Sequence, residues 1–216
     1  MTSNEQFRSL RKEYYGDELS EKSVDKNPLE QFRKWFNDAI QYGVDEPNAM
    51  ALSTSNAFGK PSSRMVLLKG FDERGFWFFT GLSSRKSQEM NQNPHACLLF
   101  YWQEYPRQIR IEGSVNKLDA DESENYFRER PRGSQIAAWT SEQSKPLSSR
   151  KDLLKKHEEF TSKFSNKEVI PCPPEWVGYL IVPDYFEFWQ GRENRLHDRI
   201  VYEKSGDEWE IKRLFP

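Results

Sequence analysis

The chain has 216 residues, of which 36% are hydrophobic and 31% are charged, and its formal net charge is -2. This length suits one domain with appendages, and 15 Phe, 9 Tyr and 7 Trp supply enough apolar surface for a core. A protein that coats nucleic acids would carry more basic than acidic residues, so we expect no nucleic-acid partner. No segment resembles a signal peptide or a membrane span, which favours a cytoplasmic protein with no membrane partner.

The two cysteines and three histidines are widely spaced along the chain. Cys97 and Cys172 form neither a disulfide framework nor a zinc motif, and the histidines show no ligand spacing. We therefore expect no metal site.

The N-terminal part, residues 1–26, is mostly polar and predicts a mobile segment ahead of a single domain at 27–216. Asn27-Pro28 predicts the start of a helix, and Gly43 predicts its end. Phe32, Phe36, Ala39 and Ile40 would form the apolar stripe of this helix.

From residue 49 the pattern becomes that of a β-sheet. Strands are predicted at 49–54, 64–69 and 76–80, with turns at 56–59 and 72–75 between them. Short loops between the strands indicate an antiparallel meander.

The remaining chain mixes helices and strands. Helices are predicted at 83–91, 119–130 and 148–164, a loop at 170–174, and strands at 95–102, 108–118, 177–182, 185–190, 199–203 and 208–214. Strands and helices do not alternate as in βαβ units. The expected fold is therefore mainly β, an antiparallel barrel with peripheral helices.

Candidate chemistry lies in clusters of basic and hydroxyl side chains, because the glycine-rich phosphate motifs are absent. The four clusters are Arg64 with Lys69; Ser83, Ser84, Arg85 and Lys86; Arg128, Arg130, Arg132 and Ser134; and Arg192, Arg195, His197 and Arg199. Each could also be a solvated charged surface or a helix end. In a regular strand Arg64 and Lys69 would face opposite sides, which predicts two anions or two subpockets.

Several segments, taken in order, resemble the pyridoxamine 5'-phosphate oxidase family from about residue 8 to residue 216. They are RKEY at 11–14, RMVLLK at 64–69, FFTGLSSRKSQEMNQNP at 78–94, RQIRIEG at 107–113, YFRERPRGSQIAAW at 126–139, SEQS at 141–144, FEFWQGRENRLHDR at 186–199 and the closing IKRLFP. The sequence departs modestly from the family pattern at Tyr15, in the 192–194 loop and at Phe79. Phe79 stands where Tyr also occurs in the family.

The resemblance implies an FMN-binding split β-barrel that works as a homodimer, with FMN at the subunit interface. The implied FMN contacts are Arg64, Met65, Val66, Leu67, Leu68, Lys69, Phe79, Thr80, Arg85, Lys86, Gln108, Gln143, Ser144, Trp189 and Arg199. Among them, the basic side chains would hold the FMN phosphate, and Gln108 would contact the polar edge of the flavin ring.

The resemblance also implies a substrate site. Its residues would be Arg11, Lys12, Glu13, Tyr14, Lys69, Tyr126, Arg130, Ser134, Arg195, Leu196 and His197. Lys69, Tyr126, Arg130 and Ser134 look like the substrate-phosphate group. Arg195 and His197 would lie at the pyridine ring as the catalytic residues, and Arg11 and Tyr14 match a segment that closes over the site.

The implied activity is that of an oxidoreductase acting on CH–NH2 donors with oxygen as acceptor, a pyridoxal 5'-phosphate synthase of vitamin B6 metabolism. Pyridoxamine 5'-phosphate or pyridoxine 5'-phosphate would pass a hydride from C4' to the flavin N5, and O2 would be reduced to hydrogen peroxide. The alcohol would give pyridoxal 5'-phosphate directly, whereas the amine would give an imine that water hydrolyses to the same aldehyde with release of ammonia.

Three other interpretations stay open. A related split-barrel flavoprotein, such as a flavin reductase or an oxidase of secondary metabolism, would share the flavin side but need not share RERPRGS or RLHDR. A non-catalytic module storing FMN or pyridoxal phosphate would not need Arg195 and His197. An RNA-binding barrel would require a continuous basic stripe, which the sequence lacks.

Overall fold

The computed structural model describes residues 13–216, so the predicted site residues Arg11 and Lys12 lie outside the described part. Within that part, nine strands form an antiparallel sheet: β1 (Ala49–Ser55), β2 (Pro61–Leu67), β3 (Gly70–Asp72), β4 (Gly75–Gly81), β5 (His95–Trp102), β6 (Arg107–Lys117), β7 (Trp176–Gln190), β8 (Asp198–Ser205) and β9 (Glu208–Arg213). The helices are α2 (Pro28–Tyr42), α3 (Arg85–Gln92), α4 (Ala120–Glu129), α5 (Arg132–Thr140), α6 (Arg150–Phe164) and the 3-10 turn η1 (Glu193–Arg195). The prediction of a mainly β fold with helices is confirmed.

The hydrogen-bonded strand order is β2-β1-β5-β6-β7-β4-β3, with β8 beside β7 and β9 beside β8. The chain forms two compact units. Unit 1 holds residues 13–50, 98–112 and 184–216, and unit 2 holds residues 51–97 and 113–183. The predicted boundary at residue 26 and the mobility of the segment before it stay predictions. No helix among residues 13–216 is long and apolar enough to span a membrane.

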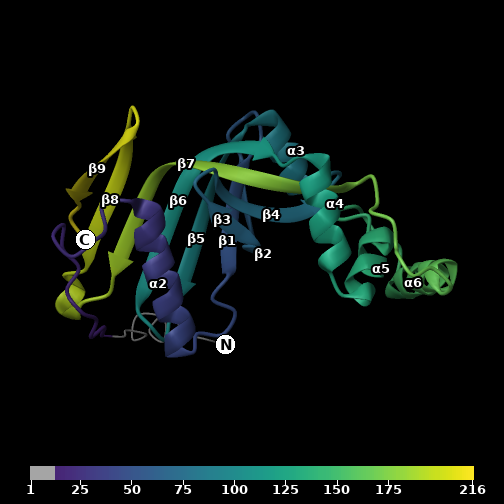
Figure 1. Ribbon diagram of the computed structural model, residues 1–216, viewed down its shortest axis with the longest axis horizontal. Helices are drawn as coiled ribbons and strands as arrows, with labels where there is room; N and C mark the ends of the chain where they lie inside the picture. The colour runs from purple at the N-terminus through teal and green to yellow at the C-terminus, as the bar shows by residue number, and fades with distance from the viewer. Residues whose placement is uncertain (1–12) are drawn as a thin grey trace, which may run out of the picture. The chain divides into compact units, whose positions relative to one another are not determined.

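Unit 1 is built around helix α2, which begins and ends as predicted. The Asn27 side chain accepts a hydrogen bond from the backbone N–H of Leu29, and Gly43 adopts a left-handed conformation with φ of 86° at the C-cap. Figure 1 shows α2 lying across the strands of this unit. The buried face differs from the prediction: Ile40 is 53% exposed and Phe36 is only half-buried. Trp35 is buried instead, packed edge-on against Phe188.

Unit 1 also contains the first described residues of the chain. The Tyr202 hydroxyl donates to the carbonyl of Asp25, Arg213 donates to the carbonyl of Leu19, and the Gly16 N–H donates to the carbonyl of Gly191. The segment before α2 is therefore attached along β8, β9 and the end of β7.

Unit 2 combines β1 to β4 with α3 and a group of three helices. Phe127 of α4, Ile136 of α5 and Phe164 of α6 form one buried cluster with Ile170. Figure 1 shows these three helices next to one another. The sequence did not predict α5 or the short strand β3, because neither carries a strong periodic pattern.

Two strands differ from the prediction in ways that matter for the site. Strand β2 ends at Leu67, and the Lys69 N–H instead donates to the carbonyl of Trp77 in β4. Strand β7 was predicted as two strands, yet it runs through Pro183. Its first half pairs with β4 through Ile181, and its second half pairs with β8 from Tyr185. Because Pro183 lies between the two paired stretches, its missing N–H breaks neither ladder.

Candidate active site

Unit 2 contains a cavity of about 830 Å³ that gathers most of the predicted site residues. Those that line it are Arg64, Met65, Val66, Leu67, Lys69, Phe79, Thr80, Arg85, Lys86, Tyr126, Arg130, Ser134, Gln143 and Ser144. They come from segments up to 80 positions apart in the chain, between residues 64 and 144, and Trp176 joins them from β7. Leu68, predicted as a cofactor contact, is buried and is not among the lining residues.

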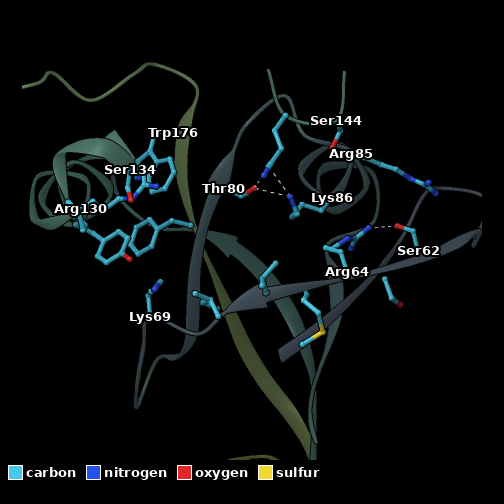
Figure 2. Close-up of a pocket in the computed structure, with 18 of the residues that line it drawn as sticks. Ser62, Arg64, Lys69, Thr80, Arg85, Lys86, Arg130, Ser134, Ser144 and Trp176 are labelled. Carbon is cyan, nitrogen blue, oxygen red and sulfur yellow. Dashed lines mark hydrogen bonds between the residues drawn. The ribbon is translucent and has the colours of Figure 1, made fainter. Parts of the chain in front are cut away.

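The cations of the cavity form two groups. Figure 2 shows the first cationic group, Arg64, Arg85 and Lys86, on one side of the view. It shows the second cationic group, Lys69 and Arg130 with Ser134, on the other side. The expectation that Arg64 and Lys69 point to opposite faces of one strand is wrong, because β2 ends before Lys69 and both side chains line the same cavity. The two cationic groups thus lie at two ends of one cavity.

Lys86 lies at the centre of the first cationic group. Its buried Nζ donates to Thr80 Oγ1 at 3.0 Å and to Gln143 Oε1 at 2.9 Å, as Figure 2 shows. Among residues 13–216 no carboxylate pairs with it. Burial, and then the charge of Arg64, lower the pKa of Lys86 to about 8. A buried ammonium group held by two neutral oxygens is a site prepared for an anion.

Arg64 and Arg85 flank Lys86, and hydrogen bonds hold both in place. Arg64 Nη1 donates to Thr54 Oγ1 at 2.6 Å and to the Leu52 carbonyl at 3.1 Å, and its Nη2 donates to Ser62. Arg85 stands in the first turn of α3, whose N-cap is Ser84. Backbone N–H groups at a helix N-terminus favour anions, which adds to the three side-chain charges.

Aromatic rings pack around the second cationic group. Phe79 stacks on Tyr126 with ring centroids 4.1 Å apart, and it lies parallel to Trp176 at 5.9 Å. The Arg130 guanidinium lies over the Trp176 ring at 4.2 Å. One of its nitrogens, Nη1, is buried without a hydrogen-bond partner in the described structure, and burial lowers the pKa of Arg130. A buried donor of this kind is available to an acceptor that enters the cavity, such as a ligand oxygen.

The predicted cluster at 128–134 divides, because it spans the junction of α4 and α5. Arg128 ion-pairs with Glu124 on the exposed face of α4, and Arg132 donates to the carbonyl of Phe164. Only Arg130, at the C-cap of α4, and Ser134 reach the cavity.

The other predicted residues lie in unit 1. The ring of His197 is 4.7 Å from that of Trp189 and 5.8 Å from that of Tyr14. The Glu13 carboxylate accepts a hydrogen bond from the Asn194 N–H, which ties the N-terminal segment to the 192–197 loop. Asn194 and Arg195 both have positive φ, at 55° and 60°. Such backbone conformations cost roughly 1–3 kcal/mol each and are typical of functional loops.

Arg199 and Gln108 were predicted as cofactor contacts, and both lie in unit 1. Arg199 Nε donates to Glu187 Oε1 at 2.7 Å, and Arg110 donates to the other oxygen of the same carboxylate. The positive charge of Arg199 is therefore partly balanced inside unit 1. Gln108 is half-buried on β6.

Sequence reasoning missed five residues that line the cavity, namely Ser62, Ser63, Glu129, Pro131 and Trp176. It also missed Glu89, which lies directly behind the wall. Two simple signals could have found two of them. Ser62 precedes Arg64 by two positions and so shares its face of the strand. Glu89 follows Arg85 by four positions and so shares its face of the helix.

Comparisons with known proteins identify the family of this chain. Residues 36–163 match the family model described as pyridoxamine 5'-phosphate oxidase, and residues 176–216 match the one described as pyridoxine 5'-phosphate oxidase C-terminal dimerisation region. A pyridoxine/pyridoxamine 5'-phosphate oxidase from Paraburkholderia phymatum is 53% identical over 208 residues, which cover 96% of this chain and 97% of that protein. A chloroplastic protein of the same name from Arabidopsis thaliana is 50% identical over 212 residues, covering 96% of this chain and 40% of the plant protein.

Two solved structures share the fold. PhzG from Burkholderia lata, solved in complex with tetrahydrophenazine-1-carboxylic acid, has a TM-score of 0.87 at 32% identity and covers 93% of this chain and 99% of its own. A pyridoxamine 5'-phosphate oxidase-related, FMN binding protein from Nostoc punctiforme has a TM-score of 0.71 at 17% identity, covering 89% and 100%. These likenesses confirm the predicted split-barrel fold. With two family models matched in order and half of the residues identical over nearly the full length of several relatives, the chain belongs to the pyridoxamine 5'-phosphate oxidase family.

Proposed function

We propose that this chain is an FMN-dependent oxidase that converts pyridoxamine 5'-phosphate or pyridoxine 5'-phosphate to pyridoxal 5'-phosphate, working as a homodimer with O2 as electron acceptor. The observation that carries the proposal is the pair of cationic groups at two ends of one cavity. The reaction has two phosphorylated reactants, the cofactor and the substrate, and each needs its own anion site.

The first cationic group fits the phosphate of FMN. Arg64, Arg85 and Lys86 present charges from a strand and from a helix N-terminus, and Lys86 has no carboxylate partner within residues 13–216. The non-polar residues Met65 and Leu67 line the same cavity and offer apolar contact to a ring. When bound, FMN accepts a hydride from the substrate and returns two electrons to O2, giving hydrogen peroxide.

The second cationic group fits the phosphate of the substrate. Arg130 would supply its orphaned Nη1, Lys69 its ammonium group and Ser134 its hydroxyl. The substrate phosphate is remote from the carbon that reacts, so its binding energy orients that carbon and is not consumed in the chemistry. The stacked rings of Phe79 and Tyr126 lie at this end of the cavity.

Arg195 and His197 would act at the pyridine ring. His197 accepts a hydrogen bond at Nδ1 from the Arg192 N–H, so the neutral ring carries its proton on Nε2. We propose that this Nε2–H donates to the substrate and that Arg195 orients the substrate and favours the redistribution of its electrons as the hydride leaves.

The direct test is anaerobic. Purified protein loaded with FMN is mixed with pyridoxamine 5'-phosphate in the absence of O2, and the flavin absorbance band is followed. We expect the band to bleach in one turnover and to return with release of peroxide when air is admitted. A band that stays unchanged with both the amine and the alcohol substrate would contradict the proposal.

A second candidate is an oxidase that acts on an aromatic carboxylic acid, since PhzG was solved with tetrahydrophenazine-1-carboxylic acid. The second cationic group argues against it, because a monoanionic carboxylate has less need of Lys69, Arg130 and Ser134 together. Bleaching by tetrahydrophenazine-1-carboxylic acid but not by pyridoxamine 5'-phosphate would favour this candidate.

A further inference from the structure

Glu89 is a buried carboxylate that stands behind the first cationic group and does not line the cavity. It lies on α3, and it is only 5% exposed. Its Oε2 accepts hydrogen bonds from Thr54 Oγ1 at 2.5 Å, from Ser62 Oγ at 2.6 Å and from Arg64 Nη2 at 3.2 Å. Its Oε1 accepts one from Arg85 Nε at 2.8 Å.

This carboxylate therefore connects two arginines that line the cavity from different elements. Arg64 comes from β2 and Arg85 from α3, while Thr54 comes from β1. The Arg85 side chain is 57% exposed and would sample many rotamers by itself. Because Glu89 binds only its Nε, the two terminal nitrogens of Arg85 keep no hydrogen-bond partner within residues 13–216 and are available to a ligand.

The charge of the group depends on Glu89 as well. Burial alone would raise the pKa of Glu89, but the hydrogen bonds from Ser62, Thr54, Arg85 and Arg64 lower it to about 2, so the carboxylate is ionised at neutral pH. Three cations, Arg64, Arg85 and Lys86, less this one anion give a net charge of +2. That value balances a phosphate dianion, whose charge near neutral pH is about -2.

We propose that Glu89 is a positioning residue for the phosphate of FMN: its carboxylate holds the guanidinium groups of Arg64 and Arg85 in the orientation that receives the phosphate. This inference rests on the proposed function, because it names how that cofactor is held. Glu89 itself makes no contact with the ligand and acts through the two arginines.

The experiment compares two ligands that differ only in the phosphate. Apoprotein is titrated with FMN and with riboflavin, and quenching of flavin fluorescence gives the two dissociation constants. Glu89→Gln keeps the size of the side chain but removes its charge. We expect it to raise the dissociation constant of FMN by about 10- to 100-fold, the usual effect of losing charge-assisted hydrogen bonds, and to leave that of riboflavin within about twofold.

Glu122→Gln is the matched control. Glu122 also ion-pairs with an arginine, Arg74, but it is exposed on α4 and is not among the residues that line the cavity. It should change neither dissociation constant. If Glu89→Gln does not fold, Glu89→Asp retains the charge and retracts it by one methylene group, and it should show the same selective loss of FMN.

A merely structural role for Glu89 would weaken both ligands alike, because both contain the same ring. The measurement is made on whichever of the two variants folds. The inference would be overturned if the affinities for FMN and riboflavin fell equally, or if the affinity for FMN did not change. A wild-type protein that binds neither ligand would instead reject the proposed function, so the two failures are distinguishable.

Discussion

The backbone N–H of Arg192 donates a hydrogen bond to Nδ1 of His197 over 3.0 Å. An unprotonated Nδ1 is required to accept it, so the neutral imidazole must be the tautomer with hydrogen on Nε2. The same contact fixes the ring beside Trp189 and Tyr14. The 192–197 loop thus determines which nitrogen of His197 can donate to a ligand.

The tautomer and pKa of His197 can be measured directly. Burial, and then the charge of Arg195, lower the pKa of His197 below 6.5. Because the folded pKa lies below the unfolded one, the neutral ring contributes stability above pH 6.5, and this contribution is lost as the pH falls through the lowered value. Nitrogen NMR of the labelled ring should show Nε2–H at pH 8 and a titration midpoint below 6.5. A proton on Nδ1 at pH 8 would contradict the assignment.

Arg130→Ala should weaken substrate binding without affecting the cofactor. The variant loses a charge-assisted hydrogen bond of roughly 1.5–3 kcal/mol, so kcat/KM for pyridoxamine 5'-phosphate should fall about 10- to 100-fold. The dissociation constant of FMN should stay within about twofold, since Arg130 belongs to the second cationic group. Arg128→Ala, which removes an exposed arginine paired with Glu124, serves as the control and should leave kcat/KM unchanged. Equal effects of the two variants would argue against the substrate-phosphate site.

The affinity for FMN should depend on pH through Lys86. Burial, followed by the charge of Arg64, lowers the pKa of this amine to about 8 in the protein without ligand, so its positive charge is lost as the pH rises through that value. FMN binding should therefore weaken above pH 8, by at most about tenfold per pH unit for one proton. In Lys86→Met the affinity should be lower and nearly flat between pH 7 and 9.5. Fluorescence titration measures both, and a wild-type affinity that is constant over this range would contradict the role of Lys86.

Gly75→Ala should destabilise unit 2. Gly75 has φ of +140°, and a Cβ there would lie 2.0 Å from the carbonyl oxygen of Ile181 in β7. We expect a loss of about 3 kcal/mol and a thermal midpoint lower by roughly 6–12 °C. Gly206→Ala is the control, because φ is also positive there, at +62°, but no atom lies within 4 Å of the added Cβ. Its loss should be near 1 kcal/mol, and similar shifts for the two variants would show that the contact with β7 is not restrictive.

Features fixed by neighbouring residues could be predicted from the sequence. Helix α2 begins and ends where Asn27 and Gly43 predict, because a cap needs only the adjacent backbone. Helix α3 follows Ser84 and stops before Pro94 for the same reason. The pattern of strands and turns between residues 49 and 81 is likewise local, so β1, β2 and β4 were predicted with errors of only a few residues at the ends, and only the short strand β3 was missed.

Features that depend on residues far away in the sequence could not be predicted in this way. The sequence pattern placed Ile40 in the apolar stripe of α2. In the structure the sheet packs against Trp35, which is buried, and Ile40 is exposed. Strand β2 ends at Leu67 because the next residues join β4, and β7 passes Pro183 because its partner changes there. Neither event leaves a signal in the few residues around it.

For the site, the sequence by itself determined the residue types and the family resemblance, since motifs keep their residues in order along the chain. Only the tertiary structure decided which cations share a cavity, that Lys86 lacks a carboxylate partner among residues 13–216, and that Glu89 holds Arg64 and Arg85 together. The physical reason is sequence separation. Thr54 and Glu89 are 35 positions apart, and their hydrogen bond exists only because the sheet and α3 pack against each other.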